Sequence, residues 1–151
     1  MASTNVPPRP AAPIHPVPPS VWRMREREAV SGLLARANAL TIVLSGQCST
    51  PDGQRREFRH YVNVLEQILD MAAEAENRAG VLSAAARKQV SRARSLCEIM
   101  LGDEVGNGLL QGNHLNDDLT SWALVALGEQ LEVAKCAVDD DETTAHCQEA
   151  A

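Results

Sequence analysis

The residues of this chain that could do chemistry are four histidines, four cysteines and their acidic neighbours. A serine or cysteine nucleophile needs a base and an orienting group close by, and the spacing of these residues supplies neither. Two of the histidines, His15 and His146, fall in segments that we expect to be tails. Cys97 falls on the apolar face of a predicted helix, where a structural thiol is expected. We therefore predict that the protein is not an enzyme.

A second group of ligand-type side chains gathers near the C-terminus and consists of Cys136, Asp139, Asp140, His146 and Cys147. A tight metal site needs its ligands at structured spacings, whereas this stretch has the composition of a solvated acidic tail. We predict no metal and no cofactor. The cysteines show no C-x-x-C spacing and no secretory signal is visible, so we expect reduced thiols in an intracellular, cytoplasmic protein.

A basic strip lies in the run AARKQVSRAR and consists of Arg87, Lys88, Arg92 and Arg94. At helical spacing these side chains form one solvated edge, which could follow the phosphates of duplex RNA. Two features oppose that function. The net charge is −6, whereas nucleic-acid binders are usually basic, and aromatic residues make up only 3% of the chain, which leaves few rings to stack on bases. Nucleic-acid binding is therefore the alternative function.

Three apolar residues, Ile99, Leu124 and Val125, lie partly off the main apolar stripes of their predicted helices. Residues in such positions extend a hydrophobic groove between helices or form a dimer contact. We predict that these three residues contact a partner protein. The expected function is that of a helical adaptor or scaffold, and self-association is one form that this function could take.

The elements that must position these side chains are four amphipathic helices. Apolar residues recur at helical spacing from Ser20 to Gly46, from Thr50 to Gly80, from Ser83 to Gly102, and from Asn113 or Asn116 to Ala137. In the last of these segments the predicted inward stripe includes Trp122, Ala123 and Ala126. No segment alternates with period two. With 151 residues, 44% of them hydrophobic, the chain is predicted to be one all-α domain, an antiparallel bundle of about four helices over residues 20–137.

Both ends of the chain are predicted to be disordered tails. Seven of the eight prolines lie within residues 7–19, and because proline removes backbone donors, residues 1–19 should be extended. The PxxP spacing there leaves open whether this tail is a ligand or a linker. Residues 138–151 begin with an acidic run and form the second tail. No run is expected to approach the ~18 apolar residues of a membrane span.

Residues 85–125 resemble the end of a GAT domain, the three-helix module of endosomal sorting adaptors. The matching pieces are Leu96–Cys97, the acidic turn Asp103–Glu104, the pair Leu109–Leu110, and the stretch from Asn116 to Leu119. This resemblance implies binding of ubiquitin or of a small GTPase on the helical faces. The chain departs from the family pattern because Leu109–Leu110 lies too far from Asn116 and because there is one helix more than the minimal module has.

Overall fold

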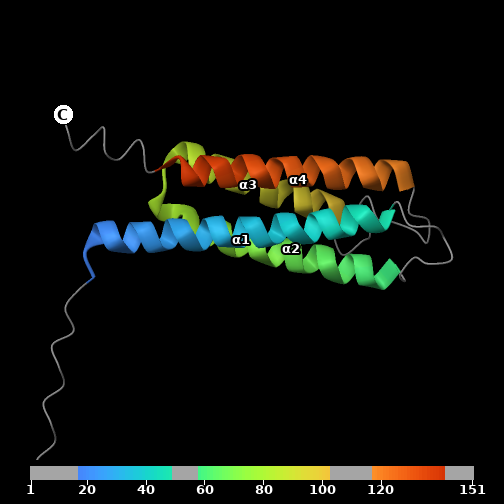
Figure 1. The fold of residues 1–151 in the computed structure, drawn as a ribbon, viewed down its shortest axis with the longest axis horizontal. Coiled ribbons are helices and arrows are strands. Elements are labelled where there is room, and N and C mark those ends of the chain that lie inside the picture. The colour runs from blue at the N-terminus through green and yellow to red at the C-terminus, as the bar shows by residue number, and fades with distance from the viewer. Residues whose placement is uncertain (1–16, 49–57, 103–116, 142–151) are drawn as a thin grey trace, which may run out of the picture.

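The computed structural model describes residues 17–48, 58–102 and 117–141 of the chain (Figure 1). Its helices are α1 (Pro19–Cys48), α2 (Phe58–Arg78), α3 (Ala84–Leu101) and α4 (Asp117–Asp139), with a 3₁₀ turn, η2 (Ala79–Val81), between α2 and α3. These four packed helices confirm the predicted all-α bundle. Residues 1–16 and 142–151 lie outside the described residues, so the predicted order of most of both tails stays a prediction.

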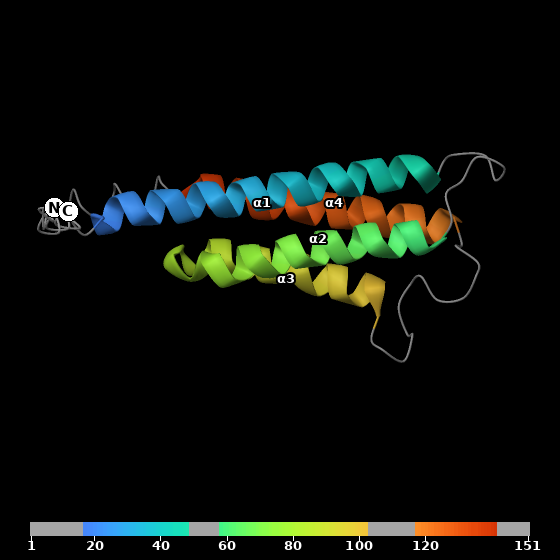
Figure 2. The same cartoon turned by 90° about the horizontal axis from the view of Figure 1, so that it is seen from below.

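The helices form a ring in which each one packs against two neighbours. Helix α1 packs against α2 and α4, and α3 packs against the same two helices from the other side. The four long axes run side by side, and successive helices run in opposite directions (Figures 1 and 2). The end of the bundle that carries the α2–α3 turn also carries the beginning of α1 and the end of α4.

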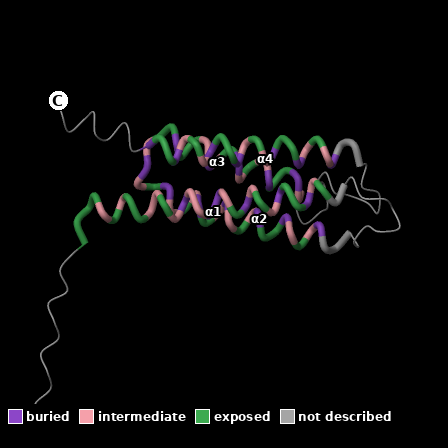
Figure 3. Tube along the Cα trace, in the orientation of Figure 1, coloured by how far each residue is buried: buried purple, intermediate pink, exposed green. Residues whose placement is uncertain are grey.

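The buried residues of every helix recur in a seven-residue repeat. Buried positions alternate at spacings of four and three residues, which is the seam of a left-handed bundle, and Figure 3 shows them recurring along the helices. The buried series are Val30, Leu34, Ala37, Thr41 and Leu44 in α1; Tyr61, Leu65, Ile68, Ala72, Ala75, Ala79 and Leu82 in α2, η2 and the residue that follows η2; Ala86, Val90, Ala93, Cys97 and Met100 in α3; and Thr120, Leu124, Leu127, Leu131, Ala134 and Val138 in α4.

The inward stripe predicted for α4 is wrong in its orientation. Leu127, Leu131 and Ala134 are buried as expected, but Trp122 is 73% exposed and Ala126 is also exposed. The seven-residue repeat explains the difference, because it places Leu124 in the core, leaves Ala123 partly buried against the core, and turns Ala126 outward. Trp122 then points away from the core.

Polar contacts beside the core fasten each pair of neighbouring helices. Glu26 of α1 accepts two hydrogen bonds from the Arg78 guanidinium of α2, at 2.8 and 3.2 Å. The hydrogen bonds from Arg78 lower the pKa of the Glu26 carboxyl. The other three contacts are Arg94 Nη1 to Glu76 Oε2 at 2.6 Å, Gln130 Nε2 to Gln89 Oε1 at 3.2 Å, and Asn38 Nδ2 to Glu132 Oε2 at 3.2 Å.

Helix α3 begins and ends as its sequence predicts. The Ser83 hydroxyl accepts a hydrogen bond from the Ala86 N–H at 3.2 Å, which is the N-cap contact. At the other end, Gly102 adopts a φ of 77° and donates its N–H to the Glu98 carbonyl at 2.9 Å. Glycine fits this left-handed conformation without a Cβ clash.

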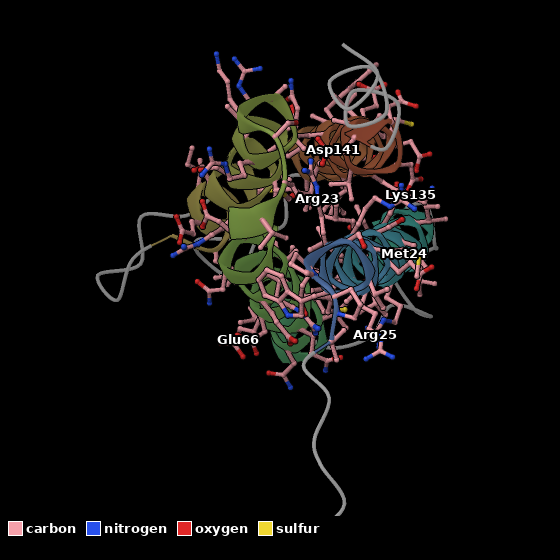
Figure 4. The ribbon with its side chains drawn as sticks, turned by 90° about the vertical axis from the view of Figure 1, so that its left-hand side faces the viewer. Arg23, Met24, Arg25, Glu66, Lys135 and Asp141 are labelled. Carbon is pink, nitrogen blue, oxygen red and sulfur yellow. The ribbon has the colours of Figure 1, made fainter. Side chains whose placement is uncertain are left out.

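An ion pair closes the core at the end of the bundle that carries the α2–α3 turn. The Asp141 side chain is 1% exposed; it accepts a hydrogen bond from Arg23 Nη2 at 3.0 Å and another from the Ser83 N–H at 3.1 Å. In Figure 4, Arg23 and Asp141 lie close together in this end of the bundle. The predicted start of a tail at residue 138 is therefore wrong, because Val138 and Asp141 are buried in the bundle.

Helix α1 is unusually apolar. By length and composition alone, its stretch Pro19–Gly46 could cross a membrane, so the prediction that no run approaches that length is wrong. From residue 29 to residue 46 its single charged residue is Arg36. In the bundle the inner side of this stretch lies in the core, and Ile42 and Val43 add apolar side chains on its exposed side.

Candidate protein-interaction surface on α1 and α4

Among the described residues, histidine, cysteine and acidic side chains do not gather into a metal site. That part of the chain contains no group of three or more such side chains placed to hold a metal ion. Cys97 is fully buried, and burial raises the pKa of its thiol to about 12, so the thiol stays protonated at neutral pH. Of the predicted ligand-type residues, Cys136 is exposed on α4, whereas His146 and Cys147 lie outside the described residues.

The basic strip is on α3, and one of its members is neutralised. Arg87, Lys88 and Arg92 are exposed. Arg94 forms salt bridges with Glu76 at 2.6 Å and with Glu98 at 2.8 Å. These hydrogen bonds raise the pKa of the Arg94 guanidinium. The strip therefore offers three uncommitted cations at most.

The three residues predicted to contact a partner protein differ in exposure. Ile99 on α3 is 64% exposed and Val125 on α4 is 43% exposed. Leu124 is 1% exposed and belongs to the core series of α4, so the expectation that it lies off the buried stripe is wrong. A substitution at Leu124 would therefore disturb the packing of the core rather than a contact on the surface of the bundle.

The outer surface of the bundle has one apolar side and one polar side. Among the described residues, the exposed large hydrophobic side chains lie just before or on α1 and on α4, with the single exception of Ile99: they are Val17, Trp22, Met24, Ile42, Val43, Trp122, Val125 and Val133. In the part of α2 whose side chains are described, from residue 61 on, the outward positions are polar and exposed: Asn63, Gln67, Asp70, Glu74 and Asn77. We call the exposed side of α1 and α4 the α1/α4 face.

A shallow groove of about 350 Å³ runs between α1 and α4 on this face. Ile42 and Val125 form apolar walls, and Thr41, Leu124 and Gly128 also line the groove. Gly128 allows the two helices to approach closely here, because a Cβ on this residue would lie 3.3 Å from Asn38 Oδ1.

Charged side chains of opposite sign lie on the two helices, with the acidic ones in the groove and a basic one elsewhere on the outer side of α1. Glu129 and Glu132 line it on α4, and both are exposed. Arg36 is exposed on α1, where its Nε donates to the Gly32 carbonyl at 3.2 Å. Within the described part of the chain, neither Arg36 nor Glu129 has a salt-bridge partner. The α1/α4 face therefore combines apolar side chains with uncompensated charge.

Sequence reasoning found only part of this face. It selected Val125 from its position beside the apolar stripe, but it placed Trp122 in the core and left Ile42 and Val43 unassigned. The available signal was the seven-residue repeat, which assigns Trp122, Glu129 and Cys136 to the outermost position of α4. Comparisons with family models, with curated proteins and with solved structures return no match to this chain. The GAT-domain resemblance stays a prediction, and most of its matching pieces lie outside the described residues.

Proposed function

We propose that the protein is a non-enzymatic interaction module that binds another protein on its α1/α4 face. The observation that carries this proposal is the outward row of α4, where Trp122 and Val133 are exposed although the bundle core beneath them is complete. Exposed apolar side chains that gather on one side of a protein mark interaction sites, and tryptophans that become buried in protein interfaces are frequent anchors of binding energy.

The groove supports the same function. A partner helix with an apolar anchor would pack between Ile42 and Val125, the usual way in which a helix binds to a helical bundle. The acidic pair Glu129 and Glu132 would favour a partner that carries a basic residue near that anchor. The polar outer side of α2 offers no comparable anchor.

The test is affinity capture with the full chain, quantified by mass spectrometry, using three forms of the protein. We expect a set of proteins bound by the parent to be lost with Trp122→Ala, because this change removes the exposed ring and leaves the core intact. The control Lys88→Glu alters a charge on α3, and binding should persist. Ubiquitin or a small GTPase among the lost proteins would support the GAT-type adaptor.

Two results would contradict this proposal. Retention of every bound protein by Trp122→Ala would show that the α1/α4 face is not used. Loss of binding in Lys88→Glu or after nuclease treatment, with affinity for duplex RNA that falls steeply as salt rises, would instead favour nucleic-acid binding by the basic strip.

A further inference from the structure

We propose that the occupant of the α1/α4 face is a second copy of this chain, so that the protein forms a symmetric dimer. This inference rests on the proposed function and specifies its partner. The two-fold axis lies parallel to the helices, and α1 of each copy packs over α4 of the other. Each contact is therefore made twice, as in any isologous interface.

The shapes of the two outer helix rows are complementary. Gly32, Ala39 and Gly46 recur every seven residues on the outside of α1, whereas Trp122 lies in the corresponding row of α4. A Cβ on Gly32 or Gly46 would meet no atom within 4 Å. A glycine inside a helix is destabilising relative to alanine. No described residue lies close enough to Gly32 to require a glycine there, whereas close approach of a second helix would require one.

The antiparallel register of α1 and α4 brings these features to the same level. Asn38 contacts Glu132 and lies against Gly128, so Ile42 lies level with Val125. One turn further along, Gly46 lies level with Trp122. Rotation about a two-fold axis parallel to the helices does not move any residue along the helix direction. Residues that are level with each other within one copy are therefore also level with each other across the interface. Trp122 then packs on the partner's Gly46, and Val125 packs beside the partner's Ile42.

The same register pairs the charges. Arg36 lies on the outer side of α1 away from the groove, about one turn from the level of Glu129, and Glu129 occupies the outermost position of α4, so the partner's Arg36 comes within reach of Glu129 at the rim of the interface. A two-fold axis across the helices would instead lay α4, with its exposed Glu129 and Glu132, on the α4 of the partner and would oppose like charges. Charge complementarity therefore favours the arrangement of α1 over α4.

The experiment is sedimentation equilibrium of the full chain with reversed charges. The parent should dimerise. Arg36→Glu alone and Glu129→Arg alone should each weaken dimerisation by about tenfold or more, because each symmetric dimer then contains two repulsive contacts. An equimolar mixture of the two variants should dimerise as tightly as the parent, since both contacts are attractive again in the mixed dimer. Lys88→Glu, with the same change of charge as Arg36→Glu, should have no effect.

Trp122→Ala provides a second measurement that does not depend on charge. Loss of an interface anchor should weaken dimerisation by about thirtyfold or more, while circular dichroism shows an unchanged helical content. A parent that remains at the monomer mass of 16.3 kDa at every concentration would overturn the dimer. If Trp122→Ala still lost other captured proteins, the proposed function would survive that result. A mixture of the charge variants that stays as weak as either variant alone would overturn the arrangement of α1 over α4.

Discussion

At the residue scale, the ion pair between Arg23 and Asp141 has the clearest effect on the structure. Asp141 occupies the position that follows Val138 in the seven-residue repeat of α4, where an apolar residue is usual. The carboxylate links α1, α4 and the start of α3 through Arg23 and the Ser83 N–H. A run of acidic residues near a chain end predicts a solvated tail, so the sequence pattern alone did not reveal this contact.

Asp141→Asn should destabilise the bundle, whereas Asp140→Asn, an exposed neighbour, should not. Burial of Asp141 opposes its ionisation, but hydrogen bonds from Ser83 and Arg23 outweigh burial and lower the pKa of this carboxyl. We expect a loss of about 1–3 kcal/mol in the free energy of unfolding at pH 7, measured by urea denaturation.

The pH dependence of stability checks the same assignment. Because the pKa of Asp141 is lower in the folded chain than the ~3.9 of an unperturbed aspartate, its contribution is present above that value and is lost as pH falls through the folded pKa. The Asn variant should therefore lose less stability on acidification than the parent. Equal slopes for the two proteins would show that the ion pair contributes nothing.

The two described thiols should differ sharply in reactivity. In a variant with Cys48→Ser and Cys147→Ser, a thiol reagent should modify exposed Cys136 rapidly at pH 8. Cys97 should react only on unfolding, because its thiol is buried and its pKa is raised to about 12. Two rapid reactions in the native protein would mean that the core opens around Cys97.

At the element scale, helical spacing predicted the four helices, but it did not predict how α4 is rotated. The N-cap Ser83 and the terminator Gly102 follow from local backbone chemistry, and both were found where expected. Helix α4 carries apolar residues on its outer side as well as its inner side, so spacing alone could not decide between Trp122 and Leu124. The rotation of α4 is set by its packing against α1 and α3, which depends on residues that are distant from α4 in the sequence.

Two glycines in the helices should respond differently to substitution by alanine. In protein diluted until it is monomeric, Gly32→Ala should raise the free energy of unfolding by about 0.5–1 kcal/mol, because alanine favours the helix and no described atom of the same chain obstructs its Cβ. Gly128→Ala should bring no gain, because its Cβ would lie 3.3 Å from Asn38 Oδ1 and 3.7 Å from Thr41 Cγ2. Equal gains in urea denaturation would show that α1 and α4 can separate at this point without cost.

At the scale of the whole molecule, the bundle has an apolar side on α1 and α4 and a polar side on α2. Sequence reasoning predicted a helical interaction module and correctly expected Ile99 and Val125 to lie off the core. It could not locate the α1/α4 face as a unit, because Ile42 and Trp122 are distant in sequence and come to neighbouring helices only in the folded bundle.

The central claim, that a second copy covers the α1/α4 face, is tested most directly by the fluorescence of Trp122. Trp22→Phe leaves Trp122 as the single tryptophan of the chain. As protein concentration rises, its emission should shift to shorter wavelength over the same range in which the mass doubles, because the exposed ring becomes buried against the partner. The same shift should be absent in the background of Arg36→Glu at those concentrations. Emission typical of a solvent-exposed indole, unchanged while the mass doubles, would contradict the claim and place the dimer contact on another face.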